Sequence, residues 1–159
     1  MDENPSRKRN RLRGHDYSQP GYYFITLCVE DMRCILGNVG ANCVRLNLSD
    51  YGKIIENEIS LLSSVYDNVR VDKYIIMPNH IHMIIVITAS DSRRPQVAPT
   101  LSTVVQQFKG SVTKKLKDSI WQRSFHDIII RTRKQYEFVW RYIDENPIRW
   151  QADKYYRKI

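Results

Sequence analysis

The sequence predicts an α+β protein on a ferredoxin-like plan: an antiparallel sheet with helices on one face, plus a C-terminal helix. Runs of aromatic and β-branched residues alternate with stretches whose apolar residues recur at helical spacing, in the order β, (β), α, β, β, α, β, α. The strands predicted over 69–77 and 81–88 are joined by only a short turn, so they must pair antiparallel. With 159 residues, the chain has room for one domain over 1–159.

The first half of the chain contains two predicted strands and a helix. Residues 22–29 are rich in aromatic and β-branched side chains, which favours a strand buried on both faces. Apolar and polar residues alternate over 44–48, which indicates a short, half-exposed strand. Ser49 or Asp50 then supplies the cap of a helix that extends to about residue 65.

The middle of the chain predicts a hairpin. Residues 69–77 and 81–88 are strongly apolar, and Pro78-Asn79 forms the turn between them. Residues 89–100 follow, rich in Pro, Ser and Arg, and we expect them to form a mobile loop inside the domain.

The last third predicts two helices with a strand between them. Apolar residues step at helical spacing over 101–116, and residues 125–131 contain three consecutive isoleucines that predict a fourth main strand. Thr132 caps the final helix, which Asn146-Pro147 ends.

The net charge of +8 is concentrated at the two ends of the chain. It is +3 over 1–13, −2 over 14–108 and +7 over 109–159. A solubilising tail or a solvated helix face explains either cluster alone, whereas two basic regions around a near-neutral body fit the footprint of a nucleic acid. There is no apolar signal segment and no membrane-length run, and the three cysteines suit reduced cytosolic thiols.

Two of the four histidines form His80-Ile81-His82 at the start of a predicted strand. Alternate strand residues share a face, so His80 and His82 point the same way and together can hold one divalent cation. A pair of core or surface histidines is the alternative. The apolar flanks favour the metal, because imidazoles at the rim of an apolar sheet need a partner.

The last helix carries a second candidate group. Its core stripe is predicted to consist of Tyr136, Val139, Trp140 and Ile143. Tyr142 lies about 120° from the centre of that stripe, and Asn146 lies beside it on the same polar flank. An ordinary amphipathic helix with a packed flank tyrosine is the alternative.

Four stretches carry a resemblance to a known family: residues 11–21, Met77-Pro78-Asn79-His80-Ile81-His82, Trp121-Gln122-Arg123-Ser124-Phe125-His126-Asp127 and Tyr142-Ile143-Asp144-Glu145-Asn146-Pro147. The chain resembles the single-tyrosine HUH transposases of insertion sequences, and among them the REP-associated tyrosine transposases. The resemblance covers nearly the whole chain. It implies a metal-dependent enzyme that cuts and rejoins single-stranded, hairpin-associated DNA through a 5′-phosphotyrosine.

The resemblance also implies roles for four residues. His80 and His82 match the paired metal ligands, Tyr142 matches the nucleophile, and Asn146 matches the third, amide-bearing ligand. Mg²⁺ or Mn²⁺ suits these ligands, although ligand type alone leaves zinc open. Relatives often carry a histidine where this chain has Ile128, so His126 stands alone in that region.

Basic residues in three regions are candidate phosphate contacts: Arg7, Lys8, Arg9, Arg11 and Arg13 in the arm 1–13, Lys109, Lys114 and Lys115, and Arg131, Arg133 and Lys134. We expect a bacterial cytoplasmic, nucleoid-associated protein, monomeric or homodimeric, with a basic tail over 147–159. A non-catalytic hairpin-binding protein is the alternative function. A metal-dependent hydrolase ranks last, because neither the pair His80 and His82 nor the pair Tyr142 and Asn146 includes a carboxylate to act as general base.

Overall fold

The computed structural model describes residues 15–40, 46–89 and 99–158. Its main sheet is antiparallel, with the strand order β4-β5-β1-β6. The strands are β1 (Gly21–Cys28), β4 (Val69–Ile76), β5 (His80–Ile87) and β6 (His126–Ile130). This order, with a helix after β1 and another after β5, is the predicted ferredoxin-like plan. The arm 1–13 and most of the expected loop at 89–100 lie outside the described residues.

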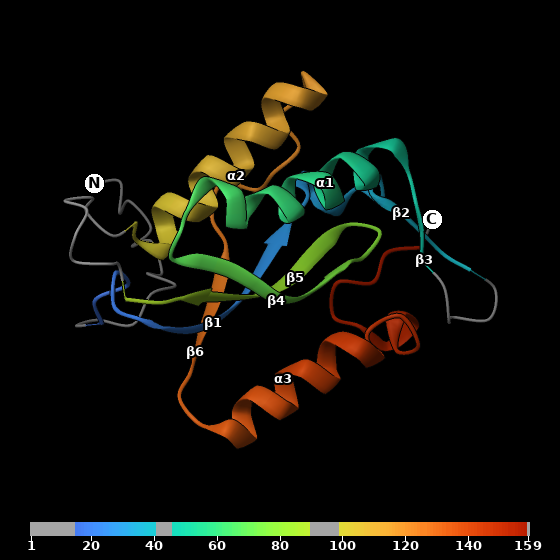
Figure 1. The fold of residues 1–159 in the computed structure, drawn as a ribbon. Helices are drawn as coiled ribbons and strands as arrows, with labels where there is room; N and C mark the ends of the chain where they lie inside the picture. The colour runs from blue at the N-terminus through green and yellow to red at the C-terminus, as the bar shows by residue number, and fades with distance from the viewer. Residues whose placement is uncertain (1–14, 41–45, 90–98, 159) are drawn as a thin grey trace, which may run out of the picture.

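The helices divide between the two faces of the sheet. α1 (Asp50–Val65) and α2 (Leu101–Leu116) cover one face, while α3 (Arg133–Glu145) lies on the other (Figure 1). The bounds of α1 and α2 are those that the apolar spacing predicts. Ser49 caps α1, and Thr132 caps α3 in a capping box with Gln135, so the side-chain oxygens satisfy otherwise free backbone N–H groups.

A second, small sheet pairs β2 (Gly37–Val39) with β3 (Leu46–Leu48). The predicted strand at 44–48 is confirmed over 46–48. β2 was not predicted, because three residues with a single apolar side chain give no periodicity to detect. Short 3₁₀ turns at Glu30–Met32 and Trp150–Ala152 complete the described elements.

The sheet separates two hydrophobic cores. The larger core packs residues such as Ile25, Leu27 and Met83 against α1 and α2. The smaller core lies under α3 and consists of Phe24, Ile84, Val86, Ile130, Val139 and Ile143. Since alternate residues of β5 share a face, His80 and His82 continue the row of Ile84 and Val86. The histidine pair therefore extends the α3 core toward one end of the sheet.

Two further findings concern the described part of the chain. It contains no helix with the length and apolarity needed to cross a membrane. Cys28 and Cys34 are free thiols, and the third cysteine lies outside the described residues.

Candidate active site

The two predicted ligand histidines meet at the end of β5. His80 and His82 are 0% and 1% exposed, and their Nε2 atoms lie 3.1 Å apart. Two nitrogens bound about 2.1 Å from one ion at right angles lie about 3 Å from each other. The pair therefore has the spacing of two ligands of a single cation.

Asn79 fixes the protonation of His80. Its side-chain amide donates to the backbone oxygens of Met32, at 3.2 Å, and Tyr155, at 2.8 Å. The amide oxygen of Asn79 therefore faces His80 and accepts from Nδ1–H at 2.9 Å. With the proton on Nδ1, Nε2 of His80 presents its lone pair to the point between the two rings.

Thr26 on β1 holds the second histidine. Its hydroxyl lies 2.8 Å from Nδ1 of His82, so a proton on Nδ1 leaves Nε2 of His82 facing that of His80. Two facing lone pairs repel each other unless a cation or a proton lies between them. This arrangement, in which partners behind each imidazole orient it, is typical of metal-ligating histidines.

Asp153 supplies an oxygen donor beside the histidines, and Asn146 at the end of α3 carries a second candidate oxygen. The ligand atoms of His80, His82 and Asp153 all lie within 4.8 Å of one another, so these residues could hold a metal ion. Asn146 is 2% exposed, and its Oδ1 is buried without a hydrogen-bond partner. A buried carbonyl oxygen without a partner is costly, and coordination to a cation would satisfy it. The donor set of imidazoles and oxygens therefore fits a divalent ion.

Burial keeps both histidines neutral. Desolvation, with smaller contributions from His82 and Lys154, lowers the pKa of His80 well below its usual value. Burial and the charge of Lys154 lower the pKa of His82 to about 3. Only neutral imidazole can ligate a metal, so both rings are ready to bind one at neutral pH.

Tyr142 lies against the histidine pair within the same chain. Its ring centroid is 5.3 Å from that of His82 and 6.0 Å from that of Phe24. The expected polar flank of the helix is thus not solvent-facing: Tyr142 is half-buried and Asn146 is buried. The reason is that α3 crosses the sheet where His82 lies and the chain after α3 closes over the outer side.

The groups around Tyr142 have opposing effects on the pKa of its phenol. Burial and the nearby charge of Asp153 raise its pKa, whereas the Asn146 amide and Lys154 act in the opposite direction. Tyr142 is therefore a protonated phenol at neutral pH. Its attack on a phosphate would need a local cation to stabilise the developing phenolate.

The segment after α3 covers the site. It runs back past the end of the sheet toward β3 (Figure 1). The ring of Tyr155 lies 4.7 Å from that of His80, and Asn79 holds the Tyr155 backbone. This packing is why both histidines are fully buried, and it gives the expected basic tail over 147–159 a structural role as well.

The basic residues predicted to contact phosphates lie in separate places. Arg131, Arg133 and Lys134 are exposed around the start of α3, on the face that carries the histidines. Lys109, Lys114 and Lys115 lie on α2, which covers the opposite face, so the structure does not bring them to the histidines.

Two of the α2 lysines already have partners. Lys109 donates to the backbone oxygens of Gln122 and Ser124, and Lys115 pairs with Glu58. Lys114 is exposed. The basic arm with Arg7, Lys8, Arg9, Arg11 and Arg13 lies outside the described residues.

Strand β6 carries the position where the sequence departs from the family pattern. Its residues His126 and Ile128 lie opposite Thr26 and Phe24 on the α3 face. His126 is exposed and Ile128 is 57% exposed. Among the described residues, the metal-competent cluster contains neither of them.

Sequence reasoning missed four members of the site. Asp153 and Tyr155 come from a segment whose sequence shows no helical or strand periodicity. Its mixture of charged and aromatic residues was the only signal that it could contribute to a site. Thr26 is one of several polar residues in an apolar strand. Asn79 was predicted only as a turn residue, although its position next to His80 was a usable signal.

The fold is that of a known transposase group. A solved REP-associated tyrosine transposase bound to a REP hairpin superposes with a TM-score of 0.66 at 20% identity, covering 87% of this chain and 73% of that one. A proposed transposase from Deinococcus radiodurans R1 gives a TM-score of 0.51 at 14% identity, covering 85% and 95% of the two chains. The predicted resemblance to REP-associated tyrosine transposases is confirmed at the level of the fold.

A sequence relative defines the family more closely. An uncharacterised protein of Haemophilus influenzae is 30% identical over 94% of this chain and 93% of its own length. The chain belongs to the same family as that protein. No protein-family model matches the chain.

Proposed function

We propose that this protein is a metal-dependent transposase that cuts and rejoins single-stranded, hairpin-associated DNA through a 5′-phosphotyrosine on Tyr142. The observation that carries the proposal is the position of Tyr142 against His82, beside two imidazoles whose Nε2 atoms face one point. The fold shared with a REP-associated tyrosine transposase supports the same function.

His80, His82 and the oxygen of Asn146 would hold the metal, with Asp153 as a further oxygen donor. Mg²⁺ or Mn²⁺ suits this mixture of nitrogen and oxygen ligands. When bound, a divalent ion supplies Lewis-acid activation of the scissile phosphate.

Tyr142 carries the covalent chemistry. Its phenolic oxygen forms a bond to phosphorus while the bond from phosphorus to the 3′-oxygen breaks, and the phenol proton passes to the departing 3′-oxygen. The 5′-phosphotyrosine retains the energy of the ester, so a free 3′-hydroxyl can reverse the step and join another end without ATP.

The charge distribution supports a DNA partner. Arg131, Arg133 and Lys134 lie on the face of the site, and the arm 1–13 adds basic charge in the sequence. Since all proposed catalytic groups come from one chain, we propose that a monomeric domain over 1–159 suffices. We place it in the bacterial cytoplasm at the nucleoid, where its DNA lies.

The test is a cleavage assay on labelled hairpin DNA with a single-stranded flank, in Mg²⁺ or Mn²⁺. Wild-type protein should form a covalent protein–DNA adduct that survives denaturing electrophoresis, and Tyr142→Phe should form none. Tyr51→Phe, on α1 at the opposite face of the sheet, is the matched control and should still form the adduct. An adduct at wild-type level in Tyr142→Phe would overturn the assignment.

Two other results would identify other functions. The burial of both histidines under Tyr155 favours a non-catalytic hairpin-binding protein, which would bind the DNA and never form an adduct. Asp153 lies beside the histidines and supplies a carboxylate that could act as a general base, so a metal-dependent hydrolase is a further candidate. Cleavage that persists in Tyr142→Phe without an adduct would indicate that hydrolysis.

A further inference from the structure

One histidine on the site face has no part in the proposed metal site or in the covalent step. His126 is the first residue of β6, and it is exposed. His80 and His82 are buried. His15 contacts Tyr23, whose ring belongs to the core on the opposite face. Of the four histidines, His126 is therefore the one whose ring can meet a substrate on the α3 face.

The strand register places His126 in line with the histidine pair. His126 lies opposite Thr26 of β1, and Thr26 lies opposite His82 of β5. Residues directly opposite each other in an antiparallel pair share a face, with Cβ atoms about 5 Å apart. The contact of 2.8 Å between the Thr26 hydroxyl and Nδ1 of His82 agrees with this register. Thr26 thus separates a buried imidazole from an exposed one.

Tyr142 lies beside the same edge of the sheet. Its ring centroid is 5.3 Å from that of His82 on β5 and 6.0 Å from that of Phe24 on β1. The edge strand β6 is next to β1, and its residue Ile128 lies opposite Phe24, two residues along from His126. Both Ile128 and His126 are exposed, so this edge is open to solvent beside Tyr142.

The imidazole of His126 has no competing partner. In the part of the chain that the structure describes, no group forms a hydrogen bond or an ion pair with it. Its neighbour Asp127 lies opposite Ile25 and faces the larger core, because successive strand residues point to opposite faces. The ring of His126 is therefore free to turn toward a bound phosphate and to transfer a proton.

We propose that His126 is the general acid of the cleavage step, which rests on the proposed function. A 3′-oxygen leaves poorly unless it is protonated as its bond to phosphorus breaks, and a positioned histidine can supply that proton. The imidazolium of His126 donates to the 3′-oxygen, and the imidazole then takes up a proton from solvent, to which the phenol of Tyr142 releases its own. The net transfer from phenol to 3′-oxygen is unchanged. In the joining step, the neutral imidazole accepts the proton of the attacking 3′-hydroxyl.

The test compares two hairpin substrates in Mn²⁺ that differ in one atom at the cut position mapped with wild-type protein. One has the ordinary 3′-oxygen, and the other has a bridging 3′-sulfur, which leaves as a thiolate without being protonated. On the oxygen substrate, His126→Gln should slow formation of the Tyr142 adduct by ~100- to 10,000-fold, the usual contribution of a general acid. On the sulfur substrate, its rate should lie within ~10-fold of wild type.

His15→Gln, on the opposite face, is the matched control and should change neither rate. Fluorescence anisotropy in EDTA should give His126→Gln the wild-type affinity for the hairpin. Weaker binding that accounts for the slower rate would mean that His126 only holds the strand, and would overturn the proposal.

Two kinetic results would also overturn it: a wild-type rate for His126→Gln on the oxygen substrate, or an equal deficit on both substrates. In either case, adduct formation by wild-type protein would leave the proposed function standing. The absence of any wild-type adduct on both substrates would instead overturn the proposed function, and the role of His126 with it.

Discussion

At the scale of single residues, the site depends on groups behind the histidines as much as on the histidines themselves. Asn79 accepts from His80 and donates to two backbone oxygens, one of them in the covering segment. Thr26 orients His82 in the same way from the neighbouring strand. These contacts determine which nitrogen of each ring is free to bind a metal.

We predict that Asn79→Ala weakens Mn²⁺ binding by roughly 10- to 100-fold, because His80 loses the partner that fixes its tautomer and ring orientation. Isothermal titration calorimetry of Mn²⁺ into the protein measures the change. Asn47→Ala, at an exposed position on β3, should leave the affinity as it is. Equal affinities for Asn79→Ala and wild type would show that Asn79 has no part in metal binding.

At the scale of elements, a buried polar bridge joins the two helices on the far face of the sheet. Glu58 of α1, which is 6% exposed, accepts from Ser111 and Lys115 of α2. Burial raises the pKa of Glu58, but the hydrogen bonds from Lys115 and Ser111 together with the charge of Lys115 outweigh burial and lower it overall. The bridge fixes α1 against α2 at a point where apolar packing alone would allow sliding.

We predict that Glu58→Gln lowers the free energy of unfolding by about 1.5–3 kcal/mol at pH 7, the usual worth of hydrogen bonds to a buried charge. The folded-state pKa of Glu58 is below its unfolded value, so its contribution is present above about pH 4.5 and is lost as the pH falls through the folded pKa. Urea unfolding at pH 7 and in acid should therefore show the gap between variant and wild type narrowing in acid.

The control for this prediction is Glu137→Gln. Glu137 pairs with Arg133 at the surface, where an ion pair contributes little. Its loss should change the stability by less than about 0.5 kcal/mol. A gap for Glu58→Gln that does not depend on pH would contradict the charge-based explanation.

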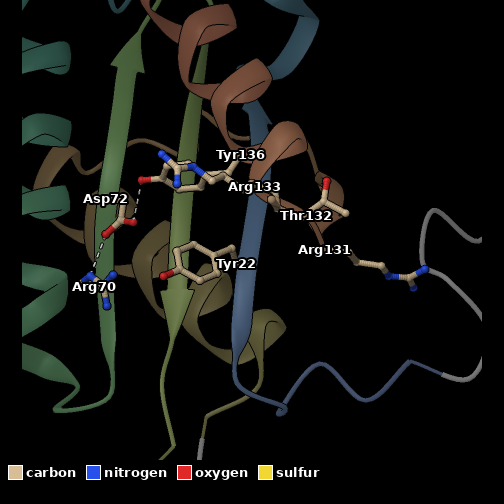
Figure 2. Close-up of a pocket in the computed structure, with 8 residues that line it drawn as sticks. Tyr22, Arg70, Asp72, Arg131, Thr132, Arg133 and Tyr136 are labelled. Atoms are coloured by element: carbon tan, nitrogen blue, oxygen red, sulfur yellow. Dashed lines mark hydrogen bonds and ion pairs between the residues drawn. The ribbon is translucent and has the colours of Figure 1, made fainter.

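At the scale of the whole molecule, the two faces of the main sheet are covered differently. α1 and α2 bury the larger core, while the other face holds α3, the histidines and a cavity lined by Tyr22, Arg70 and Tyr136 (Figure 2). The chain end then returns across the site, where Tyr155 covers His80. Access to the histidines therefore depends on the position of this segment.

We predict that deletion of residues 153–159 makes His80 and His82 reactive toward diethyl pyrocarbonate in metal-free buffer. In the full chain, His126 is exposed and should react, while both buried rings are protected. Both rings are neutral, the reactive form, at neutral pH. Mass spectrometry of the modified peptides gives the sites.

Cooperative thermal unfolding of the shortened chain is the control that it remains folded, and Tyr155→Ala provides a milder opening of the same cover. If neither variant exposes His80 or His82 to the reagent, the segment after α3 is not what protects them.

Much of the fold could be predicted from the sequence because it rests on local patterns. The apolar spacing of α1 and α2, the caps Ser49 and Thr132, and the apolar run of β5 are all properties of neighbouring residues. β2 escaped prediction because its three residues owe their conformation to pairing with β3. The surroundings of Tyr142 also differed from the predicted polar flank. Helical spacing gives the direction of a side chain around the helix axis, but it does not show which segments pack against that side.

The sequence by itself determined the antiparallel pairing of β4 with β5 across a short turn, the shared face of His80 and His82, and the spacing of Tyr142 and Asn146 on one helix. Only the tertiary structure decided that α3 crosses at the histidines, that Asp153 joins them and that Tyr155 covers them. It also decided that Tyr22 and Arg70, from different strands, share a cavity with Tyr136. The physical reason is that local geometry follows from adjacent residues, whereas a site is assembled by packing between segments far apart in the chain.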